Sequence, residues 1–138
     1  MKNPIAIEVT IQKPIDEVWM CFNNPQDIIN WNFAHESWCC PSAENDLRKG
    51  GSFKYRMEAK DQSFGFDLKG IYDEVIPHEK IQYYLEDQRK VIVYFEEIEN
   101  TSTKITEIFE PESENPIEMQ EQGWLSILTN FKNYTEKQ

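Results

Sequence analysis

The chain has 138 residues, of which 25 are Asp or Glu and 14 are Lys or Arg, so its formal net charge is −11. This length predicts a single domain over residues 1–138, because one domain usually holds roughly 100–200 residues. Neither nucleic acid nor a membrane is an expected partner, because nucleic acid and anionic lipid surfaces need a basic face and no apolar run approaches the ~20 residues of a membrane-spanning helix.

The cysteines and the N-terminal segment indicate a reducing compartment. Residues 1–8 lack the apolar stretch and the cleavage site of a signal peptide. Cys21, Cys39 and Cys40 are an odd number of cysteines, and two of them are adjacent, which does not suit a disulfide framework. We therefore expect a cytoplasmic protein.

The first fifty residues predict one strand and two helices, followed by a polar and aromatic loop. Apolar and polar residues alternate over residues 5–11, which is typical of a half-buried strand. Pro14 is placed to begin a helix, and Pro25 a second, shorter helix that reaches about residue 30. Residues 32–50 form the loop, with one short strand near residues 39–44.

A hairpin follows the turn signal at Gly50-Gly51. Apolar residues alternate with charged ones over residues 53–59, and residues 60–63 form the turn to a return strand that Pro77 ends. The residues that share one face of this return strand are Phe64, Phe66, Leu68, Gly70 and Tyr72.

Three more strands and a long helix complete the predicted order. The strands span residues 80–86, 90–99 and 102–110, and the helix begins at Pro116 with Asn115 as its cap. Because the connections between strands are too short for crossovers, the sheet is antiparallel and the fold class is α+β. The apolar stripe predicted for the helix consists of Ile117, Trp124, Leu128 and Phe131.

Three stretches carry a family resemblance that covers nearly the whole chain. They are residues 44–59 around the glycine pair, residues 70–77, and Gln122-Gly123-Trp124 in the terminal helix. In this order and spacing they resemble the START-like, or SRPBCC, superfamily. The most similar branch is the bacterial one named after the activator of the heat-shock-protein ATPase, often called polyketide-cyclase-like.

This resemblance implies a helix-grip fold, in which a curved antiparallel sheet of about six or seven strands wraps a long C-terminal helix. It also implies two short helices after the first strand and a cavity between the sheet and the terminal helix. Members of the superfamily bind hydrophobic small molecules, and a minority of them catalyse cyclisation or aromatisation. The implied partner is therefore a hydrophobic small molecule.

Candidate cavity residues come from the inward face of each predicted strand, from the helix stripe and from the loop. An apolar wall with a few polar groups is typical of ligand pockets, although the same side chains can instead fill a solid core. The candidates are Trp31, Phe33, Trp38, Phe53, Tyr55, Met57, Phe66, Leu68, Tyr72, Tyr83, Phe95, Trp124, Leu128 and Phe131.

Glu107 breaks the apolar pattern of the last predicted strand. If Ile105 and Phe109 point inward, the alternation places the Glu107 carboxyl on the same side. Burial would raise its pKa and make it a candidate general acid or an anchor for a ligand. The alternatives are a bulge that turns it outward or a position in water at the cavity mouth.

No cofactor or metal is predicted. His35, Cys39 and Cys40 lack the paired spacing of a zinc site and a fourth ligand. A nucleophilic cysteine would need His35 as its base, which is a weak arrangement.

The sequence thus favours binding without catalysis, in a monomer or a weak homodimer. One alternative is a cyclase-type or aromatase-type enzyme that uses Glu107. Another is a protein-interaction or co-chaperone-like module that acts through the acidic surface or the edge of the sheet.

Overall fold

The computed structural model describes residues 1–138 as seven strands and three helices. The two short helices follow the first strand, and the long helix ends the chain, as expected. The helices are α1 (Ile15–Asn23), α2 (Pro25–Ile28) and α3 (Ile117–Glu136). The strands are β1 (Ile5–Ile11), β2 (Trp38–Asn45), β3 (Ser52–Ala59), β4 (Gly65–Ile76), β5 (Lys80–Leu85), β6 (Lys90–Glu99) and β7 (Ser102–Phe109).

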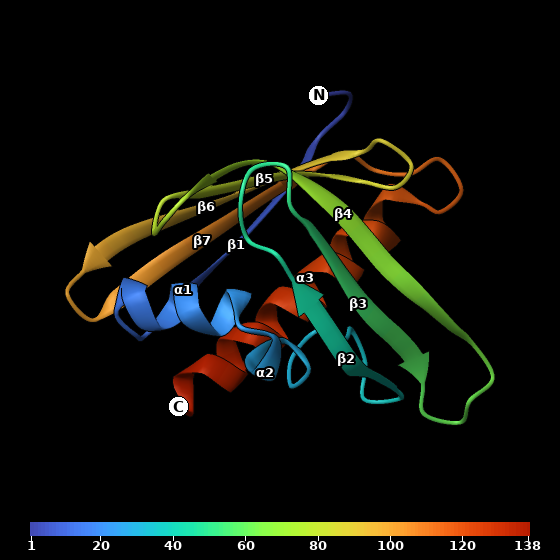
Figure 1. The fold of residues 1–138 in the computed structure, drawn as a ribbon, viewed down its shortest axis with the longest axis horizontal. Coiled ribbons are helices and arrows are strands. Elements are labelled where there is room, and N and C mark those ends of the chain that lie inside the picture. The colour runs from blue at the N-terminus through green and yellow to red at the C-terminus, as the bar shows by residue number, and fades with distance from the viewer.

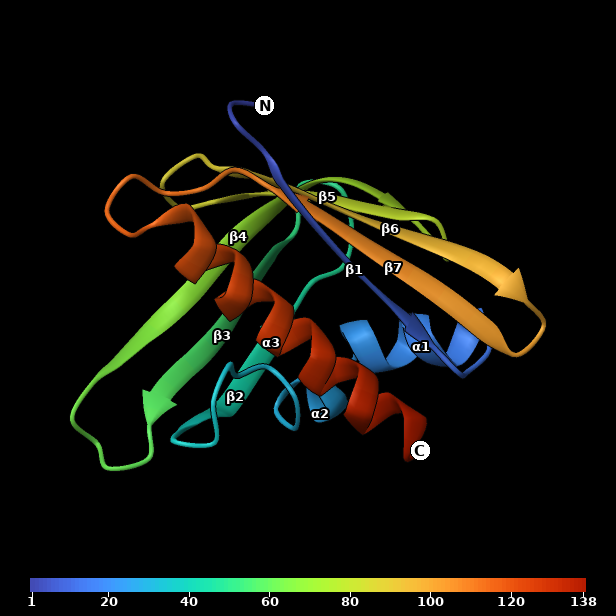
Figure 2. The ribbon, with the colours of Figure 1, turned by 180° about the vertical axis from the view of Figure 1, so that it is seen from behind.

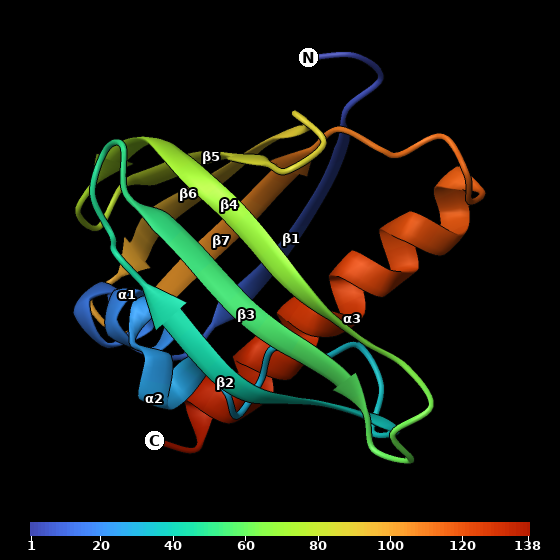
Figure 3. The ribbon, with the colours of Figure 1, turned by 45° about the vertical axis from the view of Figure 1, so that its right-hand side comes forward.

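All seven strands belong to one antiparallel sheet with the order β1-β7-β6-β5-β4-β3-β2. Consecutive strands from β2 to β7 are neighbours, and β1 pairs with β7 at one edge. The sheet bends around α3, which lies across its concave side (Figures 1 and 2). Strands β2, β3 and β4 form one side of the bent sheet and lie in front of α3 in Figure 3. The predicted α+β helix-grip fold is confirmed.

Helix α3 begins differently from the expectation. Its N-cap is Pro116, without a side-chain hydrogen bond, so the predicted Asn115 cap is wrong. The buried Gln120 holds the preceding loop instead: its amide nitrogen donates to the carbonyl oxygens of Glu112 at 3.0 Å and Asn115 at 2.8 Å. Ile117 is 48% exposed and does not belong to the buried stripe.

None of the helices combines the length and the apolar character that a membrane span needs.

An aromatic cluster fills the space between the sheet and α3 near the C-terminal end of that helix. The Phe22 ring on α1 is at its centre, with ring centroids 5.3 Å from Trp31, 5.3 Å from Phe95 and 5.2 Å from Phe131. The Trp31 indole also donates to the Cys21 carbonyl oxygen at 3.0 Å. This end of the space is therefore a packed core.

Candidate ligand-binding cavity

A cavity of about 320 Å³ lies between the sheet and α3, beyond the aromatic cluster. Of the 17 residues on its wall, 13 are hydrophobic. The polar members are few and come from separate elements, which is the composition that ligand pockets usually show. They are Asn23, Asn32, Arg89 and Glu107.

Strand register explains why the rings of β3 and β4 gather on this wall. Directly paired residues of antiparallel strands point to the same face. Phe53 pairs with Gly70, and Tyr55 pairs with Leu68. The Phe53 ring occupies the space over Gly70, where a Cβ atom would lie 2.3 Å from a ring carbon. The register continues into β5, where Tyr83 pairs with Tyr72.

Most of the residues predicted for a cavity lie on this wall. Those on the wall are Trp31, Phe53, Tyr55, Met57, Phe66, Leu68, Tyr72, Tyr83 and Trp124. The predicted residues that lie off the wall are Phe33, Trp38, Phe95, Leu128 and Phe131.

The residues off the wall have other packing partners. Phe95 and Phe131 belong to the aromatic cluster, and Leu128 is 1% exposed within the core. The Trp38 ring packs beside the exposed Phe64, at 6.0 Å between ring centroids. Phe33 packs against the margin of the core. A periodic pattern identifies the inward face of a strand or helix, but it does not show which inward residues meet an empty space.

Several wall residues were not predicted. Ile81 and Leu85 lie on β5 with the same parity as Tyr83, so strand alternation contains the signal that would have found them. Arg89 lies in the turn between β5 and β6, where no periodicity applies. The other additions are Phe22, Asn23, Asn32 and Ile127.

Glu107 lies on the cavity wall with 8% of its surface exposed. Its cross-strand neighbours are Ile7 on β1 and Val93 on β6, and neither pairing shifts register at this position. The alternative in which a bulge turns Glu107 outward is therefore wrong. Burial raises the pKa of this carboxyl to about 8, and no ion pair or hydrogen bond offsets the effect.

The tyrosine hydroxyls of the wall differ in their partners. The Tyr72 hydroxyl donates to Oδ1 of Asn45 at 2.5 Å. Burial raises the pKa of Tyr83 well above its ordinary value, and the nearby Glu107 carboxyl raises it further. No hydrogen bond contributes to the pKa of Tyr83. Tyr83 and Glu107 thus form a polar spot on a largely apolar wall.

The Arg89 guanidinium is held by groups outside the cavity. Its Nε donates to Oδ2 of Asp87 at 2.7 Å, and Nη1 donates to the Glu110 carbonyl oxygen at 3.5 Å. The positive charge of Arg89 lowers the pKa of Tyr83 slightly, against the rise caused by burial. It does not change the pKa of Glu107. Arg89 is therefore an ion-paired residue at the margin of the cavity.

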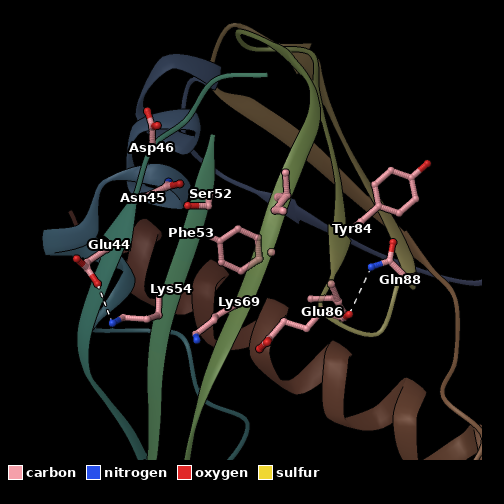
Figure 4. Close-up of a pocket in the computed structure, with 13 residues that line it drawn as sticks. Glu44, Asn45, Asp46, Ser52, Phe53, Lys54, Lys69, Tyr84, Glu86 and Gln88 are labelled. Carbon is pink, nitrogen blue, oxygen red and sulfur yellow. Dashed lines mark hydrogen bonds and ion pairs between the residues drawn. The ribbon is translucent and has the colours of Figure 1, made fainter. Parts of the chain in front are cut away.

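A second, larger hollow of about 1020 Å³ lies on the outer face of β2 to β5 (Figure 4). Its rim is charged, and the ion pair between Lys54 and Glu44, with 3.3 Å between Nζ and Oε2, lies in solvent. Ile71 on its floor is 60% exposed. Because this hollow is open and its ion pair is exposed to solvent, the more enclosed and more apolar interior cavity is the better candidate site.

No group of three or more His, Cys, Asp and Glu side chains is arranged to hold a metal ion. The His35 ring instead lies 2.9 Å from the Ser37 hydroxyl, measured from Nδ1. Cys40 is buried, and desolvation raises its pKa to about 11, which makes it a poor nucleophile.

Comparison with known proteins identifies one family. The family described as activator of Hsp90 ATPase homolog 1-like protein matches residues 12–136. No protein of curated function matches the chain.

Solved structures of similar proteins share the fold over more than nine-tenths of each chain. The AHSA1-like protein from Aeromonas hydrophila is 36% identical, with a TM-score of 0.90 over 97% of this chain and 92% of that one. A protein from Cytophaga hutchinsonii is 44% identical, with a TM-score of 0.85 over 98% and 93% of the two chains. The Aha1 dimer from Colwellia psychrerythraea is 13% identical at a TM-score of 0.75, over 96% of each chain, which shows the fold alone.

Proposed function

The chain belongs to the family of activator of Hsp90 ATPase homolog 1-like proteins, and from this membership we propose that it binds an apolar small molecule in its interior cavity. The bound molecule would lie among the rings of Phe53, Tyr55 and Trp124, with its polar end at Glu107 and Tyr83.

The observation that carries this proposal is the largely apolar space of about 320 Å³ between the sheet and α3. Protein interiors normally pack to ~0.74 density and leave few voids larger than a water molecule. A volume of this size falls at the lower end of the ~300–1,000 Å³ range of ligand pockets. An apolar compound of modest size would therefore gain contacts here without a large rearrangement of the fold.

Two substitutions on β4 distinguish binding in the cavity from binding in the outer hollow. Leu68→Trp adds a ring inside the cavity, whereas Ile71→Trp adds the same type of ring to the outer hollow. For a neutral apolar fluorophore such as N-phenyl-1-naphthylamine, we expect Leu68→Trp to weaken binding by roughly tenfold or more, because the added ring takes the ligand's volume. Ile71→Trp should bind as the wild type does.

The opposite pattern, in which only Ile71→Trp weakens binding, would assign the ligand to the outer hollow and contradict the proposal. Failure of the wild type to bind any apolar probe would contradict it as well. Thermal unfolding of both variants checks that each is folded. Chemical-shift changes of Tyr55, Phe66 and Trp124 on ligand addition locate the bound probe directly.

A second candidate function is acid–base catalysis on a bound ligand, and one observation favours it. The raised pKa of Glu107, about 8, keeps a proton on this carboxyl at neutral pH, so that it can protonate a ligand oxygen. If a reaction is found, Glu107→Gln should slow it by roughly 10²–10⁴-fold. Full activity in that variant would exclude Glu107 as the acid.

A further inference from the structure

Glu107 is an unpaired carboxyl on the wall of an otherwise apolar cavity. Its cross-strand neighbours Ile7 and Val93 are aliphatic, and it is 8% exposed. A buried acid without a partner is costly, so proteins normally provide one. Here no side chain of the chain provides a positive charge to it.

The titratable groups that share the cavity with Glu107 do not supply this partner. They are Tyr55 on β3, Tyr72 on β4, Tyr83 on β5 and Arg89 in the turn after β5, whereas α1 and α3 contribute only uncharged residues to the wall. Arg89 is paired with Asp87, and the tyrosines stay neutral because burial raises the pKa of each of them. The empty chain therefore keeps Glu107 neutral, and a positive charge that could stabilise its carboxylate form can come only with a ligand.

The rest of the wall is also suited to a cation. The faces of aromatic rings attract ammonium groups within about 6 Å of the ring centroid. Phe53 and Tyr83 lie edge to face at 5.0 Å between centroids, and Trp31 and Trp124 line the same space. A protonated amine at Glu107 would thus lie beside Tyr83, in a cavity that these other rings also line.

The electrostatic field of the whole molecule also favours a cationic ligand. With a formal charge of −11, the chain attracts cations and repels anions over several ångströms of solvent. An anionic ligand would have to approach against this field, and in the cavity it would oppose the ionisation of Glu107.

These observations lead us to propose that the ligand is an apolar amine, bound with its protonated nitrogen at the Glu107 carboxylate and its apolar part among the rings of the cavity. This inference rests on the proposed function, since it requires that the cavity be a ligand site. It excludes fatty acids and other apolar anions as the natural class.

Binding of such an amine is linked to the release of a proton. In the empty cavity Glu107 holds a proton at neutral pH, because its pKa is about 8. The cation stabilises the carboxylate and displaces that proton. Affinity for the amine therefore rises by roughly tenfold per pH unit below pH 8 and levels off above it.

Three probes with the same apolar part test the proposal: 4-phenylbutylamine, 4-phenyl-1-butanol and 4-phenylbutanoate. Their affinities are measured by calorimetry at pH 6.5 and 8 for the wild type, for Glu107→Gln and for Glu96→Gln. Glu96 lies exposed on β6, so Glu96→Gln removes the same formal charge outside the cavity. Calorimetry in buffers of different ionisation enthalpy counts the protons released.

At pH 8 we expect the amine to bind the wild type and Glu96→Gln at least roughly tenfold more tightly than the alcohol does. Glu107→Gln should lose this preference while it keeps its affinity for the alcohol. At pH 6.5 close to one proton should be released per amine bound to the wild type.

Two results would overturn the inference, and they are distinguishable. If the alcohol or the carboxylate binds the wild type as tightly as the amine, the ligand class is wrong although the cavity remains a binding site. If none of the three probes binds, the proposed function fails together with the inference. Glu107→Gln replaces a protonated carboxyl with an uncharged amide of similar size, so the variant should fold. The proton count needs only the wild type.

Discussion

Glu107 occupies a strand position where the alternation requires an apolar side chain. Its row across the sheet runs from Ile7 on β1 through Glu107 on β7 to Val93 on β6. A carboxyl in this row avoids the cost of a buried charge by keeping its proton. The fold tolerates Glu107 at neutral pH for that reason, and the residue makes stability depend on pH.

The sign of this pH dependence follows from the pKa of Glu107 in the folded and in the unfolded chain. Burial raises the pKa of Glu107 from its ordinary value of 4.5 to about 8 in the folded chain. Between these values the folded chain holds a proton that the unfolded chain has lost, so rising pH favours unfolding. We expect the free energy of unfolding of the wild type to fall relative to that of Glu107→Gln by about 1.4 kcal/mol per pH unit.

Urea denaturation of both proteins at pH 4, 4.5, 6, 7, 8 and 9 measures the difference. By pH 7 it should reach roughly 3 kcal/mol relative to pH 4.5, and it should change little above pH 8 or below pH 4.5. Other groups that titrate contribute equally to both proteins, so they cancel in the comparison. Parallel stability curves would show that Glu107 is ionised or hydrated in the folded chain.

Replacement of glycine by alanine should have opposite effects on the free energy of unfolding in a strand and in a helix of this fold. An Ala Cβ at Gly70 on β4 would lie 2.3 and 2.5 Å from two atoms of the buried Phe53 ring. At Gly123 on α3 nothing lies within 4 Å of that position. Gly70→Ala should lower the free energy of unfolding by about 1–3 kcal/mol, whereas Gly123→Ala should raise it by up to about 1 kcal/mol through helix propensity.

Chemical denaturation of the two variants and the wild type tests this pair. Equal effects of both substitutions would mean that the Phe53 ring moves aside at little cost. Since Phe53 is on the cavity wall, Gly70→Ala should also weaken binding of an apolar probe, while Gly123→Ala should not.

At the level of elements, much of the fold could be predicted because strands and helices leave periodic patterns. The inward parity of β3 and β4 follows directly from the alternation around Tyr55 and Leu68, and the same rule placed Glu107 inward. The first turn of α3 could not be predicted in this way. Gln120 is buried because it binds the backbone of the preceding loop, whereas Ile117 is exposed. Both positions are decided by tertiary contacts, which leave no periodic pattern in the sequence.

At the level of the whole molecule, the sequence does not show which inward residues pack together and which surround a cavity. The answer depends on α1, whose Phe22 meets Trp31, Phe95 and Phe131 and fills one end of the bent sheet. The other end receives no such element, and the cavity remains there. Contacts between elements distant in sequence decide this division, so composition and spacing do not reveal it.

The net charge of −11 is a property of the whole molecule that bears on its stability. An excess of like charge destabilises a compact state through self-repulsion, and salt screens that repulsion. Salt also weakens the ion pairs, but these are exposed, as in Lys54 and Glu44, whose side chains are 48% and 73% exposed. Exposed pairs contribute little, with a median of about 0–1 kcal/mol each.

We therefore expect the melting temperature to rise as NaCl is increased from 20 to 500 mM, because relief of the repulsion outweighs the lost ion pairs. A gain of 1 kcal/mol shifts the melting temperature of a domain of this size by roughly 2–8 °C, which differential scanning calorimetry resolves easily. Repeating the scan at pH 4.5, where many exposed carboxylates are partly protonated, should reduce the effect of salt. A melting temperature that falls with NaCl at neutral pH would mean instead that attractive pairs dominate the electrostatics of the fold.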